Sequence, residues 1–247
     1  MIPMKLTYII PFLFFTSLSH SNADKEINMA TDQWKPYYAQ GMQNQGPITE
    51  ITRLVLNQLD YQLNVSFVPW NRALEHTKKG NYDAILGAYS NTERDLYFWY
   101  SDAITISETI LFGHQDSYKQ TANLNAFEGS RICIINGYYY SDAFTGNRLF
   151  SKVKSNTLDH CFKRLIARRV DYVAADKRVG QALLNEQFSE DKALLTMLPL
   201  VISQQTLHIL WSKKTADFFE LNKAFNLKLQ ELKKSGEIEA IWKKHGF

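Results

Sequence analysis

The residue whose type and setting point most directly to chemistry is Arg94. It follows the apolar run at residues 84–86, and an aromatic run at residues 97–100 comes next. An arginine just past a strand end, where a helical turn begins, offers a bidentate guanidinium and unpaired backbone N–H groups to a carboxylate. The sequence therefore predicts an anion-binding site at Arg94. The alternative is a surface arginine paired with Glu93 or Asp95, because most arginines are exposed.

Residues 1–23 have the pattern of a secretory signal. Lys5 precedes an apolar run over residues 6–15, and small residues precede Asp24. An apolar core of about ten residues is half the length that a membrane span needs. We therefore expect cleavage near Ala23 and export of the mature chain. The alternative is an uncleaved N-terminal anchor.

The composition is that of an ordinary globular chain. Of its 247 residues, 45% are hydrophobic and 21% are charged, with a formal net charge of +3, so the chain can build a core but has no strong field for nucleic acid. It contains no CxxC, no HExxH and no histidine-rich cluster. We therefore expect no nucleic-acid partner, no metal and no cofactor.

The two cysteines, Cys133 and Cys161, allow one disulfide. The first falls in a predicted strand at 131–135 and the second in a predicted helix at 158–167. Exported chains meet an oxidising compartment, and a bond across this loop would stabilise the fold by roughly 3 to 4 kcal/mol in the chain-entropy model. The alternative is two separate thiols that pack as small hydrophobic groups.

Strands and helices alternate along the chain, which predicts an α/β architecture with largely parallel sheets. In such sheets the ligand crevice forms at the carboxyl ends of the strands. The loops at those ends carry Trp34, Trp70 and residues 89–94. The predicted strands are 26–30, 62–68, 82–86, 105–112, 131–135, 170–175 and 206–211, and the predicted helices begin at Pro47 or span 71–79, 158–167, 179–188, 216–234 and 237–244.

In this order, several motifs together resemble the periplasmic solute-binding proteins of amino-acid uptake, extracellular family 3. The resemblance covers essentially the whole mature chain. The motifs that carry it are Ala30-Thr31-Asp32 with Pro36-Tyr37, Gly46 to Leu54, Asp83-Ala84 with Gly87 and Thr92-Glu93-Arg94, Tyr100-Ser101-Asp102, Gly129 to Gly137, Val170-Asp171-Tyr172-Val173 with Asp176, and Lys234-Ser235-Gly236 with Ile241-Trp242.

The resemblance implies an α/β periplasmic binding protein-like II fold of two lobes, with two sheets flanked by helices and joined by two hinge strands. Lobe 1 would combine residues 24–105 and 206–247, and lobe 2 would hold residues 110–200. The hinges would lie at about 106–109 and 201–205.

The resemblance also implies roles for two charged residues. Arg94 matches the arginine that clasps the ligand α-carboxylate, and Asp176 matches the lobe 2 carboxylate that takes the α-ammonium. A zwitterion held by one fixed cation and one fixed anion keeps its charges paired after it loses water. The alternative for Asp176 is the N-cap of the following helix, and the two roles are compatible.

Aromatic and small residues complete the implied ligand site. Trp70 and Trp34 resemble the aromatic walls that flank the ligand side chain, and ordinary packing is the alternative for each. Asp32 and Gly87 come from the same motifs and are included among the ligand-binding residues. Tyr89 departs from the family, which has a small hydroxyl residue at that position.

Lobe 2 departs from the family as well, because residues 137–141 place three tyrosines where a Gly-Thr or Gly-Ser turn is usual. Tyr138 and Tyr139 would bring bulk and phenol hydroxyls into a normally tight pocket. The ligand therefore stays open among an aromatic or cationic amino acid, a small peptide and an unrelated carboxylate. The alternative is strand-edge packing with the rings turned outward.

The implied function is non-enzymatic capture of a small zwitterionic solute, such as an amino acid, for uptake by an ABC transporter. The implied partners are the small ligand and a membrane permease or receptor, and the protein would be a monomer. One alternative is an exported dehydratase-like enzyme on the same fold, although no paired carboxylates or histidine-centred arrangement stand out. Another is a sensory protein that reports ligand to a membrane receptor.

Overall fold

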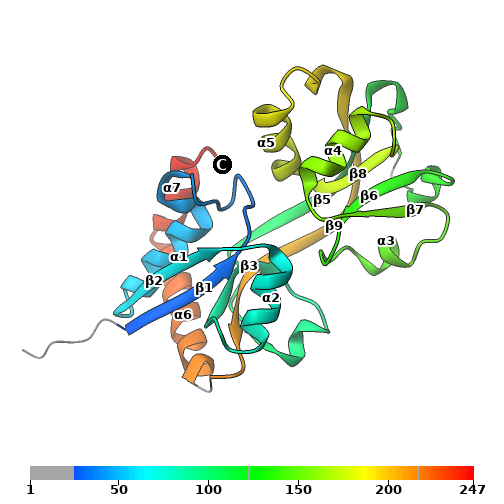
Figure 1. Cartoon of the computed structure of the whole chain (residues 1–247). Coiled ribbons are helices and arrows are strands. Elements are labelled where there is room, and N and C mark those ends of the chain that lie inside the picture. Colours follow the sequence, from blue (N-terminus) through cyan, green and yellow to red (C-terminus); the bar gives the residue numbers. More distant parts are fainter. Residues whose placement is uncertain (1–24, 122, 216) are drawn as a thin grey trace, which may run out of the picture.

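The computed structural model describes residues 25–121, 123–215 and 217–247. Two α/β lobes lie side by side, and two long strands run from one into the other (Figure 1). The predicted signal segment, its cleavage point and Asp24 lie outside the described residues. None of the helices in the described part of the chain is long and apolar enough to cross a membrane.

Three parallel strands form the sheet of the first lobe. They are β1 (Lys25–Thr31), β2 (Tyr61–Phe67) and β3 (Ala84–Tyr89), with β1 in the middle. The parallel order predicted from the alternating elements is confirmed. The short strand β4 (Phe98–Tyr100), which the sequence did not predict, pairs with β9 instead.

The sheet of the second lobe repeats this plan. It contains β6 (Arg131–Ile135), β7 (Ser151–Ser155) and β8 (Tyr172–Asp176), which are parallel, with β6 in the middle. Strand β7 was not predicted, because its sequence Ser-Lys-Val-Lys-Ser is polar and half exposed.

The two connecting strands are β5 (Thr105–His114) and β9 (Leu195–Ser212). They pair antiparallel with each other from Thr105 opposite Leu207 to His114 opposite Leu195. Because β9 also pairs with β3, and β5 with β8, the two sheets are halves of one nine-stranded sheet.

Strand β9 is far longer than the predicted 206–211. The first half of β9 was not predicted because Pro199 has no N–H for the hydrogen-bond ladder, and a proline argues against the interior of a strand. In the structure the β5–β9 register shifts between Ile110 and Phe112, whose partners are Val201 and Met197. Pro199 therefore falls in the irregular part of the pairing.

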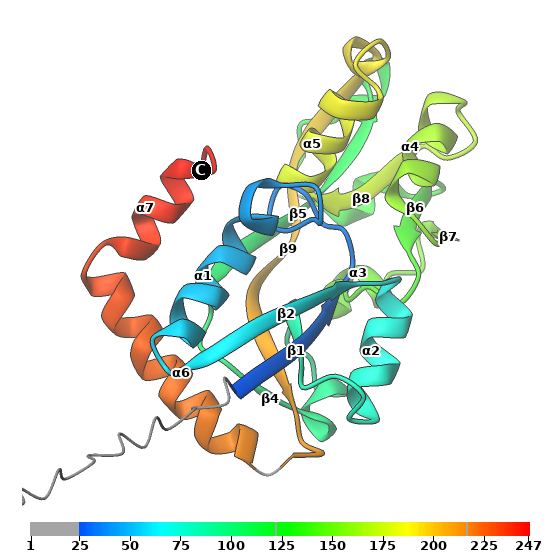
Figure 2. The same ribbon diagram turned by 60° about the vertical axis from the view of Figure 1, so that its left-hand side comes forward.

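Helices cover both lobes (Figure 2). The predicted helices are confirmed to within about two residues at each described end, and the short α3 was missed. The first lobe carries α1 (Pro47–Asn57), α2 (Trp70–Lys78), α6 (Asp217–Lys234) and α7 (Glu237–Lys244), and the second carries α3 (Asp142–Gly146), α4 (Leu158–Ile166) and α5 (Lys177–Gln187).

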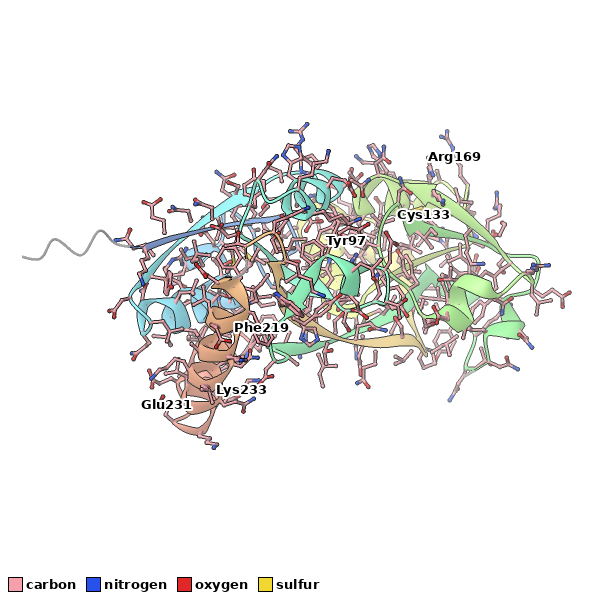
Figure 3. The ribbon with its side chains drawn as sticks, turned by 90° about the horizontal axis from the view of Figure 1, so that it is seen from below. Tyr97, Cys133, Arg169, Phe219, Glu231 and Lys233 are labelled. Atoms are coloured by element: carbon pink, nitrogen blue, oxygen red, sulfur yellow. A yellow bond between two sulfur atoms is a disulfide. The ribbon has the colours of Figure 1, made fainter. Side chains whose placement is uncertain are left out.

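Each lobe has its own hydrophobic core. In the first, the buried faces of α1 and α6 pack on the sheet around Trp211 and Phe225. In the second, Cys133 on β6 and Cys161 on α4 form a disulfide, with their Cα atoms 5.6 Å apart. Figure 3 shows Cys133 and Phe219, on α6, toward opposite ends of the molecule. The disulfide therefore ties α4 to β6 within the second lobe.

Candidate functional site

A cavity of about 910 Å³ lies where the two lobes meet. A chamber of about 30 Å³ adjoins it, with room for roughly two water molecules. All the residues predicted to bind ligand line one of these spaces or both. Six residues line both and so form the partition between them: Asp32, Trp34, Trp70, Tyr89, Tyr138 and Tyr139.

Arg94 lies in the small chamber and opens the 3-10 turn η2 (Arg94–Leu96) after β3. Only 4% of the residue is exposed. Its guanidinium donates one hydrogen bond of 2.7 Å to the backbone oxygen of Tyr89 and lies 5.1 Å from the ring centre of Trp70. Burial lowers the pKa of Arg94.

The alternative interpretation of Arg94, a surface arginine paired with Glu93 or Asp95, is wrong. No acidic oxygen among the described residues lies within 4.0 Å of the guanidinium. Its backbone N–H is not free, however, because it donates to the side-chain oxygen of Asn91 at 2.8 Å. The anion-binding capacity of Arg94 therefore lies in its guanidinium alone, whose remaining N–H groups have no acceptor in the described part of the chain.

Asp176 lines the large cavity at the end of β8 and is 6% exposed. One carboxylate oxygen, Oδ1, caps α5 by accepting from the backbone N–H groups of Arg178 and Val179 at 2.9 and 2.8 Å. The other, Oδ2, accepts from the hydroxyls of Ser107 at 2.6 Å and Tyr37 at 3.2 Å. Burial raises the pKa of Asp176, and these hydrogen bonds oppose the shift. The helix cap weighed for this residue is therefore present.

Asp32 follows β1, is half-buried and lines both spaces. It accepts a hydrogen bond of 2.8 Å from the hydroxyl of Tyr138, which reaches over from the second lobe. Burial raises the pKa of Asp32 to about 6, while the Tyr138 hydroxyl and the residue's own backbone N–H lower it. No basic side chain in the described part of the chain forms an ion pair with Asp32.

Tryptophan rings form two walls of the site. Trp34 stacks on Tyr37, with ring centres 4.8 Å apart, and meets Tyr89 edge-on at 5.9 Å. Trp70 opens α2, and its Nε1–H donates to the backbone oxygen of Gly137 at 3.2 Å. The two walls are therefore fixed by contacts within and between the lobes.

The tyrosines that depart from the family pattern point into the site. The hydroxyl of Tyr89 lies 2.5 Å from that of Ser107. Tyr138 meets Trp70 edge-on at 6.1 Å, and Tyr139 lines both spaces. Of the two alternatives for the tyrosine run, inward rings and outward strand-edge packing, the structure has the first for these residues.

Gly87, within β3, lines the small chamber. Its φ of +72° lies in the left-handed region, and a Cβ there would come within 2.5 Å of the Tyr38 ring. The Tyr38 hydroxyl donates to the backbone oxygen of Gly87 at 2.8 Å. Gly87 therefore makes the space that Tyr38 fills.

Sequence reasoning missed several residues of the site. Tyr37 and Tyr38 belong to an aromatic loop whose density of rings could have marked them. Ser107 carried no signal, because it lies within a crossing strand. Lys35 and Glu186, which form a 2.8 Å ion pair between the lobes, are half-exposed charges of a kind that occurs across most surfaces.

The chain matches the model of the bacterial extracellular solute-binding proteins, family 3, over residues 27–247. That match covers both lobes. The chain therefore belongs to this family, and the resemblance inferred from the motifs is confirmed. No curated protein sequence matches it significantly.

Solved structures with the same fold include proteins of different roles. One is an amino acid ABC transporter substrate-binding protein from Streptococcus pneumoniae bound to L-arginine, with 17% identity, a TM-score of 0.74 and coverage of 89% of this chain and 94% of that one. A histidine kinase sensor domain with similarity to periplasmic binding proteins has 21% identity and a TM-score of 0.75, with 90% and 96% coverage. An ancestral amino acid-binding protein, a precursor of cyclohexadienyl dehydratase, has 15% identity and a TM-score of 0.73, with 89% and 94% coverage. At these identities the likeness shows the fold alone.

Proposed function

We propose that this family 3 protein captures a small zwitterionic solute, such as an amino acid, between its two lobes. The observation that carries the proposal is Arg94, a buried guanidinium with no acidic partner among the described residues, beside the cavity between the lobes. An unpaired buried charge costs several kcal/mol. A carboxylate of the ligand would provide the missing partner through charge-assisted hydrogen bonds.

Ligand binding would be coupled to closure of the two lobes. We place lobe 1 at residues 24–105 and 206–247, lobe 2 at 110–200, and the hinges near 106–109 and 201–205. The register shift in the β5–β9 ladder after Thr109 supports a hinge there. A ligand held by both lobes would favour the closed state through the contacts that only this state provides.

The setting we propose is the periplasm, with the protein acting as a monomer that delivers its ligand to an ABC permease. A structural relative that serves an amino acid ABC transporter supports this role. The sensor domain among the relatives supports the second possibility, a report to a membrane receptor. A pull-down from membranes with the ligand-loaded protein, followed by identification of the bound partner, distinguishes a permease from a receptor.

A catalytic role is the second candidate, and one observation favours it. The carboxyl of Asp32, whose pKa is raised to about 6, lies at the cavity where a general acid would be needed. The proposal of a binding protein without catalysis predicts that prephenate and arogenate stay intact during long incubation with the protein. Loss of either substrate that is abolished in Asp32→Asn would instead establish an enzyme.

Binding is tested with Arg94→Met, which removes the charge but keeps a long apolar side chain in the buried space. A thermal-shift screen of the twenty amino acids identifies a ligand, since saturation at one hundred times its dissociation constant stabilises by about 2.7 kcal/mol. Calorimetry should then show a loss of affinity of about 100-fold in Arg94→Met, because two charge-assisted hydrogen bonds are worth about 3 kcal/mol.

The matched control is Arg72→Met, which replaces an exposed arginine on α2. This variant should bind as the wild type does. Circular dichroism of both variants checks that they are folded. An unchanged affinity in folded Arg94→Met for every ligand found would refute the proposed function.

A further inference from the structure

We propose that Asp32, and not Asp176, receives the ammonium group of the ligand. The inference rests on the proposed function, because it assumes a ligand whose carboxylate pairs with Arg94. It moves the anionic contact from the second lobe to the first. Three features of the structure carry it: the hydrogen bonds of Asp176, the open acceptor sites of Asp32, and the spaces that the three charged residues face.

Asp176 has no acceptor site left for a ligand. A carboxylate offers about four lone-pair positions. Two of them hold the backbone N–H groups that begin α5, and the other two hold the hydroxyls of Ser107 and Tyr37. These donors come from the second lobe, from β5 and from the loop after β1. An ammonium group, which only donates, would have to displace one of them.

Asp32 has acceptor sites to spare. Its Oδ2 accepts from the Tyr138 hydroxyl, and its own backbone N–H is the other donor that lowers its pKa. About two lone-pair positions remain. Asp32 is also more exposed than Asp176, which is 6% exposed, so a ligand has better access to it.

The spaces that these residues line favour Asp32 over Asp176. Arg94 and Asp32 line the same small chamber, whereas Asp176 lines only the large cavity. The carboxylate and ammonium groups of an α-amino acid are bonded to the same carbon atom. An ammonium group next to a carboxylate that pairs with Arg94 would therefore lie in or beside that chamber, and Asp32 is an acid that lines both the chamber and the large cavity.

Aromatic rings surround the same position. Trp34, Trp70 and Tyr138 line both spaces together with Asp32. The faces of such rings attract a cation, and a desolvated site strengthens that attraction. The Tyr138 hydroxyl would remain on Asp32 and close the second lobe over the ligand. In this arrangement the first lobe holds both charges, and the second lobe responds through Tyr138.

The test compares two isosteric variants, Asp32→Asn and Asp176→Asn, with two sets of probes. The first set is the twenty L-amino acids, and the second is their deamino acids, such as 3-phenylpropanoate beside L-phenylalanine. The two sets share the carboxylate and the side chain and differ only in the ammonium. Asparagine remains a good N-cap, so Asp176→Asn keeps the start of α5.

We expect Asp32→Asn to weaken the binding of amino acids by about 10- to 100-fold, with little effect on the deamino acids, since a hydrogen bond to a charged group is lost. Asp176→Asn should change the two sets equally, by less than about 3-fold. A selective loss for amino acids in Asp176→Asn, or no selective loss in Asp32→Asn, would overturn the inference. If no probe of either set binds the wild type, the proposal of an amino-acid ligand fails, and the inference loses its basis.

Discussion

The hydrogen bonds of Asp176 predict a large difference between two substitutions at this position. Asp176→Ala removes the N-cap of α5, which costs about 1 kcal/mol. It also leaves the buried hydroxyls of Ser107 and Tyr37 without their acceptor, at about 1 kcal/mol each or more. We therefore expect Asp176→Ala to lower the free energy of unfolding by about 3 kcal/mol.

Asp176→Asn should cost less than about 1 kcal/mol. Asparagine caps helices as well as aspartate does, and the two hydroxyls can turn to accept from its amide N–H groups. The substitution also removes a carboxylate whose pKa is raised by burial, so part of the desolvation cost disappears. The side chains of both variants are uncharged, so the two variants differ in hydrogen bonding and not in charge.

Urea unfolding of both variants, followed by far-ultraviolet circular dichroism and tryptophan fluorescence, measures the free energies. Coincident transitions by the two probes would justify a two-state treatment of the two lobes. A cost below 1 kcal/mol for Asp176→Ala would contradict the assigned hydrogen bonds. An equal cost for Asn and Ala would mean that the charge itself stabilises the fold.

Other positions give further predictions. The pKa of Asp32 is raised from 3.8 to about 6 in the folded state, so the stabilisation by its protonated carboxyl is complete below pH 3.8 and is lost as the pH rises through 6. Relative to Asp32→Asn, the free energy of unfolding of the wild type should therefore fall by about 3 kcal/mol between pH 3.5 and pH 7.5. Urea titrations at both pH values measure this difference. Gly87→Ala should cost at least about 2 kcal/mol in the same assay, since it combines a left-handed backbone with a clash against Tyr38. Trp70→Phe loses the hydrogen bond to Gly137 that joins the two lobes. Small-angle scattering should then show a wider distribution of distances between the lobes. An unchanged profile would show that this contact does not hold the lobes together.

Most of the fold could be predicted from the sequence because its elements carry strong local signals. Pro47 at the start of α1 and the apolar steps of Ile48, Ile51 and Val55 describe a helix with one buried face, and all three side chains are buried. The elements that escaped prediction are short or polar. Strand β7 offers only Val153 as an apolar residue, so the strand exists through its pairing with β6 and not through its own pattern.

Many residues that line the candidate site could also be marked from the sequence, but their hydrogen bonds could not. Arg94 and Asp176 could be marked from motif and position, because strand ends of an α/β sheet gather ligand contacts. That Asp176 would be saturated by four donors, and Asp32 would not, depends on how loops from distant parts of the chain meet. A motif indicates which residues come together, but it does not show which of their acceptor sites are occupied by donors of the protein itself.

The contact between Ser107 and Asp176 shows how strand register decides which acceptor sites the protein fills. Alternate residues of a strand face the same side of the sheet, so Ser107 and Thr109 share a face of β5. The β5–β8 register places Thr109 opposite Asp176, which brings the Ser107 hydroxyl to the carboxylate. A one-residue slip of this register would turn Ser107 to the other face and free one of the two acceptor positions on Oδ2 of Asp176, while Tyr37 would keep the other. The number of acceptor positions that Asp176 could offer to an ammonium group therefore depends in part on the register of one pair of strands.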